Sequence, residues 1–491
     1  MIAIISIIST IIISMLIINL LWVYFYTYCL FDRQEEEQPY DGIIRVSVYS
    51  KATTLLTLFG ILFYEVYLWK NFLLLSPNEL VYQYSLEFGD ITFFEFNSNL
   101  NLLFIILSTF ILIISLLTMW KSSINMVVFC NMLLLLKLFL LGAFSCVNLF
   151  IFLLCFEASA LPIFILIIYC GSQRRERIKA SYYFIFFTFY GSLSLLLLLL
   201  IFYSLNQLTI ISDITLNQST NGTLWLLMFT AFAVKIPLFP FHIWLPYAHV
   251  EASTSTSILL AALMLKLGGY GLIKFMLPLF TVQTHFKYQW VGLSLCIIGC
   301  VYSSFAALRQ IDLKRNIAFS SIAHMSFATA GIFSFTEIGI KGSVYLMVSH
   351  GLTSAALFFL IGTLSDRYHT RSIMAFSGLL AAMPIFSFFL ILISLANVGF
   401  PGTSGFLPEV MILIGIVSSL NYFTQVGLFF IIFGMLITTI STLVVLLRLL
   451  FGHLKILYTN SSWVDLTRIE YFILLILTIF IIVLGFVDVL I

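Results

Sequence analysis

The sequence has few charged residues for its length. Its 491 residues include 23 Lys and Arg and 21 Asp and Glu, so only 9% are charged, against about 25% in an ordinary soluble domain. Hydrophobic residues make up 62%, and the mean hydropathy is +1.12. So few charges cannot cover the surface of a soluble fold, which excludes soluble enzymes, nucleic-acid binders and disordered scaffolds. The net charge of +2 predicts no bulk electrostatic partner.

Cysteine clusters are also missing. None of the seven cysteines forms a CxxC pair, so no zinc or iron–sulfur spacing is present. Cys296 and Cys300 share a helix face, and we interpret the cysteines as small buried hydrophobes. No GxGxxG opens a helix after a strand. We therefore expect no metal, NADH, flavin or quinone site on this chain.

The N-terminus lacks the marks of a cleaved targeting segment. It has no basic region, no small-residue cleavage site and no Arg-rich stretch, and it is apolar almost from the first residue. A first spanning helix over residues 3–30 is therefore expected. The 51 Phe and 23 Tyr are typical of an AT-rich coding sequence such as an organelle gene.

Long apolar runs predict an all-α polytopic membrane protein. A spanning helix needs about 20 apolar residues, and the runs give about 14 spans. Residues 31–51 are expected to form a charged loop, and residues 76–99 an irregular or amphipathic connection. The span at 379–419 is too long for one straight helix. The expected spans are 3–30, 53–75, 100–120, 124–143, 146–169, 180–204, 222–247, 251–278, 289–307, 315–334, 338–364, 379–419, 424–450 and 468–490.

The positions of the basic residues predict the orientation. When the loops between the predicted spans are numbered in order, 16 Lys and Arg fall in odd-numbered loops and three in even-numbered loops. The remaining four lie inside predicted spans. Basic loops stay on the cytoplasmic side or its organellar equivalent. The sixteen therefore mark that side, and both termini are predicted on the opposite side.

Ionisable residues lie in the middle of several predicted spans, where they are expensive and are functional candidates by default. A buried Lys–Glu pair is adjustable, because moving the carboxylate away lets the lysine release its proton, and a neutral His can pass protons on. The alternative is that each group is a structural ion pair or lines a cavity. Lys137 and Glu65 are weaker candidates whose role is open. The candidate proton-relay residues are Glu157, Lys235, Lys266, His324, His350 and Glu409.

Two predicted helices are interrupted. Prolines 237, 240 and 246 follow Lys235, and the run NVGFPGTSGFLPE precedes Glu409. Broken backbone at membrane depth must be buried in protein or line water, and a pair of such breaks is typical of transporters with inverted repeats. The offset of five helices predicts two inverted units, helices 4–8 and 9–13, with interruptions in helices 7 and 12. The glycines of LKLGGYG are interpreted as a helix-packing surface.

Six runs resemble one known family in the same order: FEASALP, KIPLFPFHIWLPYAHVEAS, LMLKLGGYGLIKF, DLKRNIAFSSIAHMSF, SHGLTSAALFFLIGTL and GFPGTSGF. The sequence resembles the antiporter-like membrane subunits of respiratory complex I, and within them the chain 4 type. The resemblance covers about residues 100–450. The glutamate at position 409 favours the chain 4 type, since relatives often carry lysine there. One departure is EASTST at 251–256, where the family has a proline.

The resemblance implies a function and a setting. The chain would translocate protons through a Glu, Lys and His chain, driven by quinone reduction in other subunits that hold NADH, FMN, iron–sulfur clusters and ubiquinone. Its partners would be membrane lipid and other membrane-arm subunits, including neighbouring antiporter-like ones. It implies the mitochondrial inner membrane, with the termini facing the intermembrane space. The expected divisions are N-terminal helices at 1–100, a translocating core at 101–450 and a C-terminal loop and helix at 451–491.

Two other functions remain open at this point. An Mrp-type cation/proton antiporter subunit would have the same fold and would work without a redox partner. A purely structural membrane subunit would carry its buried charges for packing alone.

Overall fold

The computed structural model describes residues 11–16, 39–74, 85–88, 91–95, 99–120, 126–172, 174–204, 221–419, 422–453 and 463–486. Ten helices in these ranges are long and apolar enough to cross a membrane. The predicted all-α polytopic class is therefore confirmed. Most of the first predicted span, 3–30, lies outside the described residues, so the count of about 14 spans stays a prediction.

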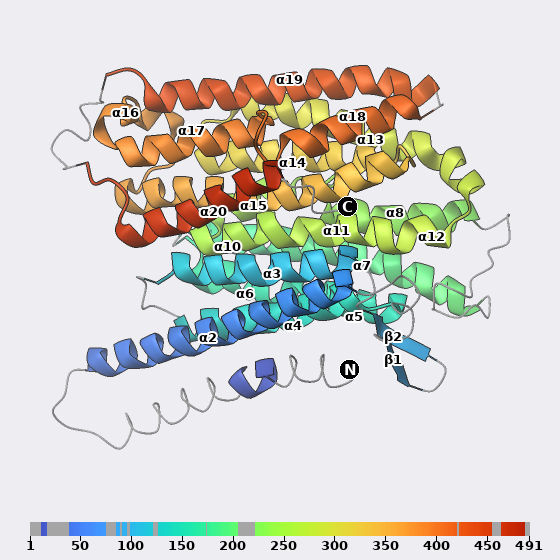
Figure 1. Cartoon of the computed structure of the whole chain (residues 1–491), viewed down its shortest axis with the longest axis horizontal. Helices are drawn as coiled ribbons and strands as arrows, with labels where there is room; N and C mark the ends of the chain where they lie inside the picture. The colour runs from blue at the N-terminus through green and yellow to red at the C-terminus, as the bar shows by residue number, and fades with distance from the viewer. Residues whose placement is uncertain are drawn as a thin grey trace. The chain divides into compact units, whose positions relative to one another are not determined.

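Figure 1 shows the order of the elements along the chain. They are α2 (Pro39–Leu74), β1 (Ser85–Phe88), β2 (Ile91–Glu95), α3 (Asn99–Thr118), α4 (Met126–Ser145), α5 (Leu149–Ala158), α6 (Ala160–Cys170), α7 (Glu176–Ser204), α8 (Asn221–Lys235), α9 (Trp244–Glu251), α10 (Thr254–Leu259), η2 (Leu260–Met264), α11 (Leu265–Gly271), η3 (Leu272–Met276), α12 (Leu277–Leu279), α13 (Val282–Arg309), α14 (Leu313–Ile332), α15 (Glu337–Tyr368), η4 (Ile373–Ala375), α16 (Leu379–Ala382), α17 (Pro384–Val398), α18 (Phe406–Ser418), α19 (Tyr422–Leu450) and α20 (Arg468–Phe486).

Two sequence predictions near the N-terminus are wrong. Helix α2 begins at Pro39, so the predicted loop at 31–51 is helical from that residue onward; proline suits a first helical turn because its φ is already helical. The connection at 76–99 contains an antiparallel strand pair, with Ser85 opposite Glu95 and Phe88 opposite Ile91. The sequence ITFFE is rich in β-branched and aromatic residues, which favour a strand.

The chain divides into two compact units, one formed by residues 1–173 and 201–214 and the other by residues 174–200 and 215–491. In the first unit, α2, α3 and α4 pack side by side, and α4 also packs on α5 and α6. In the second unit, α13, α14, α15, α18 and α19 form the main helix bundle. The candidate residues Lys235, Lys266, His324, His350 and Glu409 all belong to this second unit.

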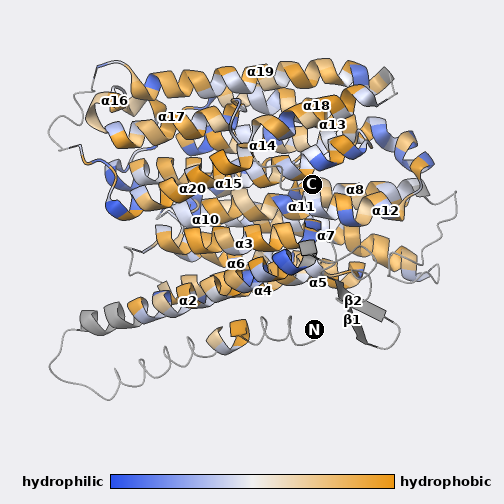
Figure 2. Ribbon diagram, viewed as in Figure 1, coloured by the Kyte–Doolittle hydropathy of each residue, from blue (hydrophilic) through white to orange (hydrophobic). Residues whose placement is uncertain are grey.

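Helix α15 is the most enclosed of the long helices of the second unit that could span a membrane. Its most apolar 18-residue stretch is 100% buried, whereas the same measure is 28% for α19 and for α20. Large apolar side chains such as Phe63 and Phe429 are 80% and 70% exposed. Figure 2 shows hydrophobic residues along most of each helix and hydrophilic ones mainly toward the helix ends. This pattern fits a surface solvated by lipid rather than by water.

The segment before α20 holds two helices of the second unit. Arg367 at the end of α15 donates to the Val464 carbonyl at 2.6 Å and forms an ion pair with Glu470. The Asp465 carboxylate accepts the backbone N–H groups of Ile385 and Phe386 at 2.9 and 3.1 Å. Because these N–H groups open α17, the carboxylate acts as an N-terminal cap.

Candidate functional site

The first interruption follows Lys235, as predicted. Helix α8 ends at this residue, and α9 begins at Trp244. Pro237 cannot donate a backbone hydrogen bond, and the Leu238 N–H bonds the Ala233 carbonyl instead at 3.0 Å. The Trp244 indole donates to the Val234 carbonyl, also at 3.0 Å. Carbonyls released by the break are thus satisfied inside the protein, as broken backbone at membrane depth requires.

The second interruption separates α17 from α18 inside the predicted span 379–419. Gly399 and Gly402 have positive φ of 77° and 88°, which favours glycine at both positions. The Phe400 N–H bonds the Leu395 carbonyl at 3.1 Å, and the Ser404 N–H reaches the Ile481 carbonyl of α20 at 3.0 Å. A Cβ at Gly399 would lie 2.3 Å from Oε2 of Glu409. The turn therefore lies directly against the Glu409 carboxylate.

Lys266 lies between two π-helical segments, η2 and η3, which the sequence did not predict. Its ammonium donates to the Ala261 carbonyl within η2 at 2.6 Å. The side chain is only 1% exposed. Single π-helical turns are frequent at functional sites because they release backbone groups from the regular ladder. Here the buried lysine ammonium bonds a carbonyl of the preceding π-helical segment.

Four of the candidate residues form a row, and each comes from a different helix: α11, α15, α14 and α18. Lys266 Nζ lies 3.0 Å from Nδ1 of His350 on α15. The rings of His350 and His324 are 5.8 Å apart between centroids, and His324 Nδ1 lies 4.0 Å from Oε1 of Glu409 on α18. All four side chains are largely buried, and His324 Nε2 has no hydrogen-bond partner. The row therefore consists of neighbouring groups that can hold or exchange a proton.

Helix α8, which ends at Lys235, packs closely on α11, which carries Lys266. A Cβ at Gly268 would lie 2.6 Å from Cγ1 of Ile236 and 3.0 Å from the Phe232 carbonyl. Glycine therefore lets the end of α8 contact the helix that carries Lys266, which confirms the packing interpretation of LKLGGYG. Lys235 itself is 1% exposed.

Glu157 belongs to the first unit. It is the penultimate residue of α5, and a break at Ser159 separates α5 from α6. The glutamate is half-buried. Its predicted attraction to Lys235 of the second unit stays a prediction.

Sequence reasoning missed an ion pair in the first unit. Lys137 Nζ lies 2.7 Å from Oε1 of Glu65, and the two side chains are 0% and 1% exposed. Thr109 donates to Oε2 of the same carboxylate at 2.7 Å, and Lys137 also bonds the Ser108 hydroxyl at 3.0 Å. The two charges were recognised separately, and their opposite signs in apolar helices were the available signal for pairing them.

Two cations, the buried Lys314 and the half-buried Arg371, also hold the C-terminal end of α9. Lys314 donates to the Ala252 carbonyl at 3.0 Å, and Arg371 bonds the Val250 carbonyl. Cations are favourable at a helix C-terminus, where the last carbonyls lack helical partners. These basic residues were predicted only as orientation markers.

Comparison with known proteins assigns the family. The family described as NADH:quinone oxidoreductase/Mrp antiporter, TM, matches residues 146–438. This chain belongs to that family. The match covers more than half of the chain and includes all six candidate residues, whereas Glu65 and Lys137 lie outside it.

Similar proteins are named as chains or subunits of NADH-ubiquinone or NADH-quinone oxidoreductases. NADH-ubiquinone oxidoreductase chain 4 of Chondrus crispus is 40% identical over 434 residues, which cover 86% of each protein. NADH-quinone oxidoreductase subunit M of Rickettsia felis is 46% identical over 289 residues, which cover 58% of each.

Two solved structures share the fold at a TM-score of 0.77. A chain of respiratory complex I from Thermus thermophilus is 25% identical and covers 89% of this chain, which in turn covers 91% of it. A chain of the Mrp complex from Dietzia sp. is 17% identical, and the match covers 89% of this chain and 90% of the Mrp chain. At that identity, the Mrp likeness concerns the fold alone.

Proposed function

We propose that this chain is the chain 4 or M-type membrane subunit of a proton-translocating NADH:quinone oxidoreductase. The observation that carries the proposal is the buried row Lys266, His350, His324 and Glu409, within a chain whose relatives at 40% identity and above are named as complex I subunits. NADH, FMN, iron–sulfur clusters and ubiquinone would be held by other subunits. Its partners are neighbouring membrane-arm subunits and lipid.

The geometry supports a stepwise transfer along the row. At 3.0 Å, Lys266 Nζ can pass a proton directly to Nδ1 of His350. The 5.8 Å between the two rings requires one bridging water or a ring rotation, and the 4.0 Å from His324 to Glu409 requires a small approach. Two neighbouring cations repel one another when buried. A proton that arrives at Lys266 therefore favours release of a proton from the neighbouring His350.

Coupling to the redox reaction would act through Glu157 and Lys235. When the carboxylate approaches, it stabilises the charged lysine, and when it withdraws, the proton is released toward Lys266. Moving one charge across 100 mV requires about 2.3 kcal/mol, so the attraction must change by a few kcal/mol in each cycle.

The same proposal assigns the setting. The chain would lie in the mitochondrial inner membrane, with its basic loops in the matrix and both termini on the other side. Protons would be taken up from the matrix near Lys235 and leave past Glu409.

The test is a reconstituted complex that carries Lys235→Ala. We expect its proton pumping to fall while the complex still assembles; full pumping at the normal rate of quinone reduction would contradict the proposal. The Mrp-type alternative predicts that the tagged chain purifies without quinone-reductase subunits and transports sodium. The purely structural alternative predicts altered assembly and intact pumping for Lys266→Ala and Glu409→Ala.

A further inference from the structure

A buried imidazole on α13 joins the two helices that carry Lys235 and Lys266. The Trp225 indole of α8 donates to Nδ1 of His285 at 3.3 Å, and Nε2 of the same ring lies 3.1 Å from the Leu277 carbonyl of α12. An indole can only donate, so Nδ1 accepts and Nε2 carries the proton that bonds the carbonyl. Trp225 and His285 are 0% and 5% exposed. We call these two hydrogen bonds the His285 bridge.

The bridge lies at a similar distance along both helices from the two lysines. Trp225 comes ten residues before Lys235 on α8, and Leu277 comes eleven residues after Lys266 on the span Thr254–Leu279. At 1.5 Å per residue, each lysine is about 15–16 Å along its helix from the bridge. If one helix moved along the other, at least one of the two hydrogen bonds would break.

The same two helices pack together between the bridge and the lysines. A Cβ at Gly271 would collide with the ring of Phe232 on α8. The ring of Phe229 stacks on the Trp225 indole, with centroids 5.2 Å apart. Close-packed interiors transmit a displacement instead of absorbing it. A shift at the bridge therefore changes how the two lysines face one another.

The face of α13 that carries His285 also binds α14. Gln289 is four residues further on and therefore lies on the same face. Its amide donates to the Phe333 carbonyl at 2.6 Å, at the end of the helix that carries His324. The Phe333 ring packs on Trp225, with centroids 6.2 Å apart. Helix α13 thus holds the two lysine helices and α14 in one arrangement.

We propose that His285 is a positioning residue for proton transfer from Lys235 to Lys266. Its two hydrogen bonds keep α8 and the Lys266 span in the register that this transfer requires. The imidazole does not carry the proton itself, because both ring nitrogens are engaged and each lysine is about three helical turns away. The inference rests on the proposed function, because it concerns the same transfer.

The test compares His285→Met with His285→Gln in the reconstituted complex, by protons translocated per NADH oxidised. The two new side chains have nearly the same length, but only glutamine can donate to the Leu277 carbonyl. We expect His285→Met to assemble and to lose at least half as much pumping as Lys235→Ala. His285→Gln should recover at least half of that loss. Full pumping by His285→Met would overturn the inference, and so would an equal deficit in both variants.

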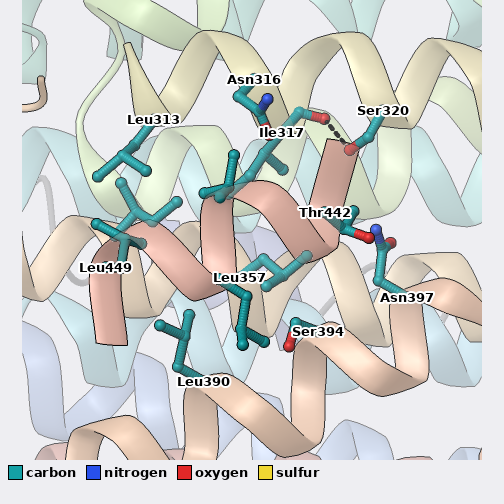
Figure 3. Close-up of a pocket in the computed structure, with 13 residues that line it drawn as sticks. Leu313, Asn316, Ile317, Ser320, Leu357, Leu390, Ser394, Asn397, Thr442 and Leu449 are labelled. Atoms are coloured by element: carbon teal, nitrogen blue, oxygen red, sulfur yellow. Dashed lines mark hydrogen bonds between the residues drawn. The ribbon is translucent and has the colours of Figure 1, made fainter. Parts of the chain in front are cut away.

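Two control variants leave the bridge intact. Tyr288→Phe removes a hydroxyl from the ring that stacks on Trp225 at 5.4 Å. Thr442→Val removes a hydroxyl whose hydrogen bond to the Thr439 carbonyl stays within α19. Thr442 lines a cavity between α14, α15, α17 and α19, and no residue of the bridge lines that cavity (Figure 3). Both controls should pump fully. A loss in Thr442→Val as large as that in His285→Met would contradict a specific role of the bridge.

The two proposals fail in different ways. If Lys235→Ala pumps fully, the proposed function is wrong and this inference falls with it. If Lys235→Ala pumps poorly and His285→Met pumps fully, only the inference is wrong. If His285→Met does not assemble but His285→Gln does, the bridge is purely structural, which also overturns it. If neither assembles, Trp225→Phe decides, since it keeps an aromatic ring and removes the donor. Reduced pumping by that variant supports the bridge, and full pumping overturns it.

Discussion

The buried pair Glu65–Lys137 leads to a prediction about stability. At 2.7 Å, the attraction between the charges is about 6 kcal/mol for an effective dielectric constant of 20. Removing water from both groups offsets most of this gain. Removing one partner is different, because the other charge stays buried with no counter-charge, and such changes cost about 3–5 kcal/mol. We therefore expect Lys137→Met alone to destabilise the subunit severely.

The double variant Glu65→Leu/Lys137→Met should recover most of the loss. It removes both charges and fills the space with apolar groups, a replacement that is often neutral or stabilising. The matched control is the exposed pair Glu337–Lys341, which is separated by 2.9 Å, with the side chains 81% and 50% exposed. Lys341→Gln should have little effect, since exposed helix pairs contribute about 0.3–0.5 kcal/mol.

The assay is the amount of subunit in the assembled complex, by quantitative mass spectrometry, together with the thermal inactivation midpoint of that complex. A loss of 3–5 kcal/mol is a large share of an ordinary stability of roughly 5–15 kcal/mol, so abundance should drop several-fold. Equal abundance of wild type and Lys137→Met would refute the reasoning. So would a double variant less stable than the single one.

Three further substitutions test the packing of the two interrupted helices. Gly268→Ala places a Cβ 2.6 Å from Ile236, and the overpacking should cost about 1–3 kcal/mol and lower the amount of assembled complex. The control is Gly60→Ala, which should not lower assembly because nothing lies within 4 Å of the added Cβ. Gly399→Ala should displace the Glu409 carboxylate and reduce pumping in the assembled complex. In the control Gly402→Ala, the nearest neighbour of the added Cβ is 3.6 Å away. This control should cost only about 1–2 kcal/mol of backbone strain and should keep pumping. Asp465→Ala removes the cap of α17 and should lower the thermal midpoint by the equivalent of about 0.5–2 kcal/mol, while an unchanged midpoint would contradict the assigned cap.

Much of the fold could be predicted because membrane helices follow simple rules. Apolar runs and basic loops predicted the helical class, and Pro and Gly clusters predicted the breaks after Lys235 and before Glu409. The strand pair at 85–95 and the helical start at Pro39 were missed. In those stretches polar and apolar residues are mixed, and their conformation depends on packing that no local pattern encodes.

The site was predictable as a set of residues but not as an arrangement. Lys266, His350 and Glu409 were recognisable because charge is rare at membrane depth. Their order depends on which helix faces lie together, and the π-helical turns around Lys266 have no sequence signature. For the same reason Glu65 and Lys137 were seen as two isolated charges. Pairing needs three-dimensional proximity, which composition and spacing do not supply.

The most direct test of the proton row is Glu409→Gln in the reconstituted complex, measured as protons translocated per NADH oxidised. Glutamine keeps the size of the side chain but cannot take up a proton and release it again. Glu337→Gln, at an exposed position, serves as the matched control. We predict that the ratio falls in Glu409→Gln and is unchanged in Glu337→Gln. An unchanged ratio and an unchanged rate of quinone reduction in Glu409→Gln would contradict the account.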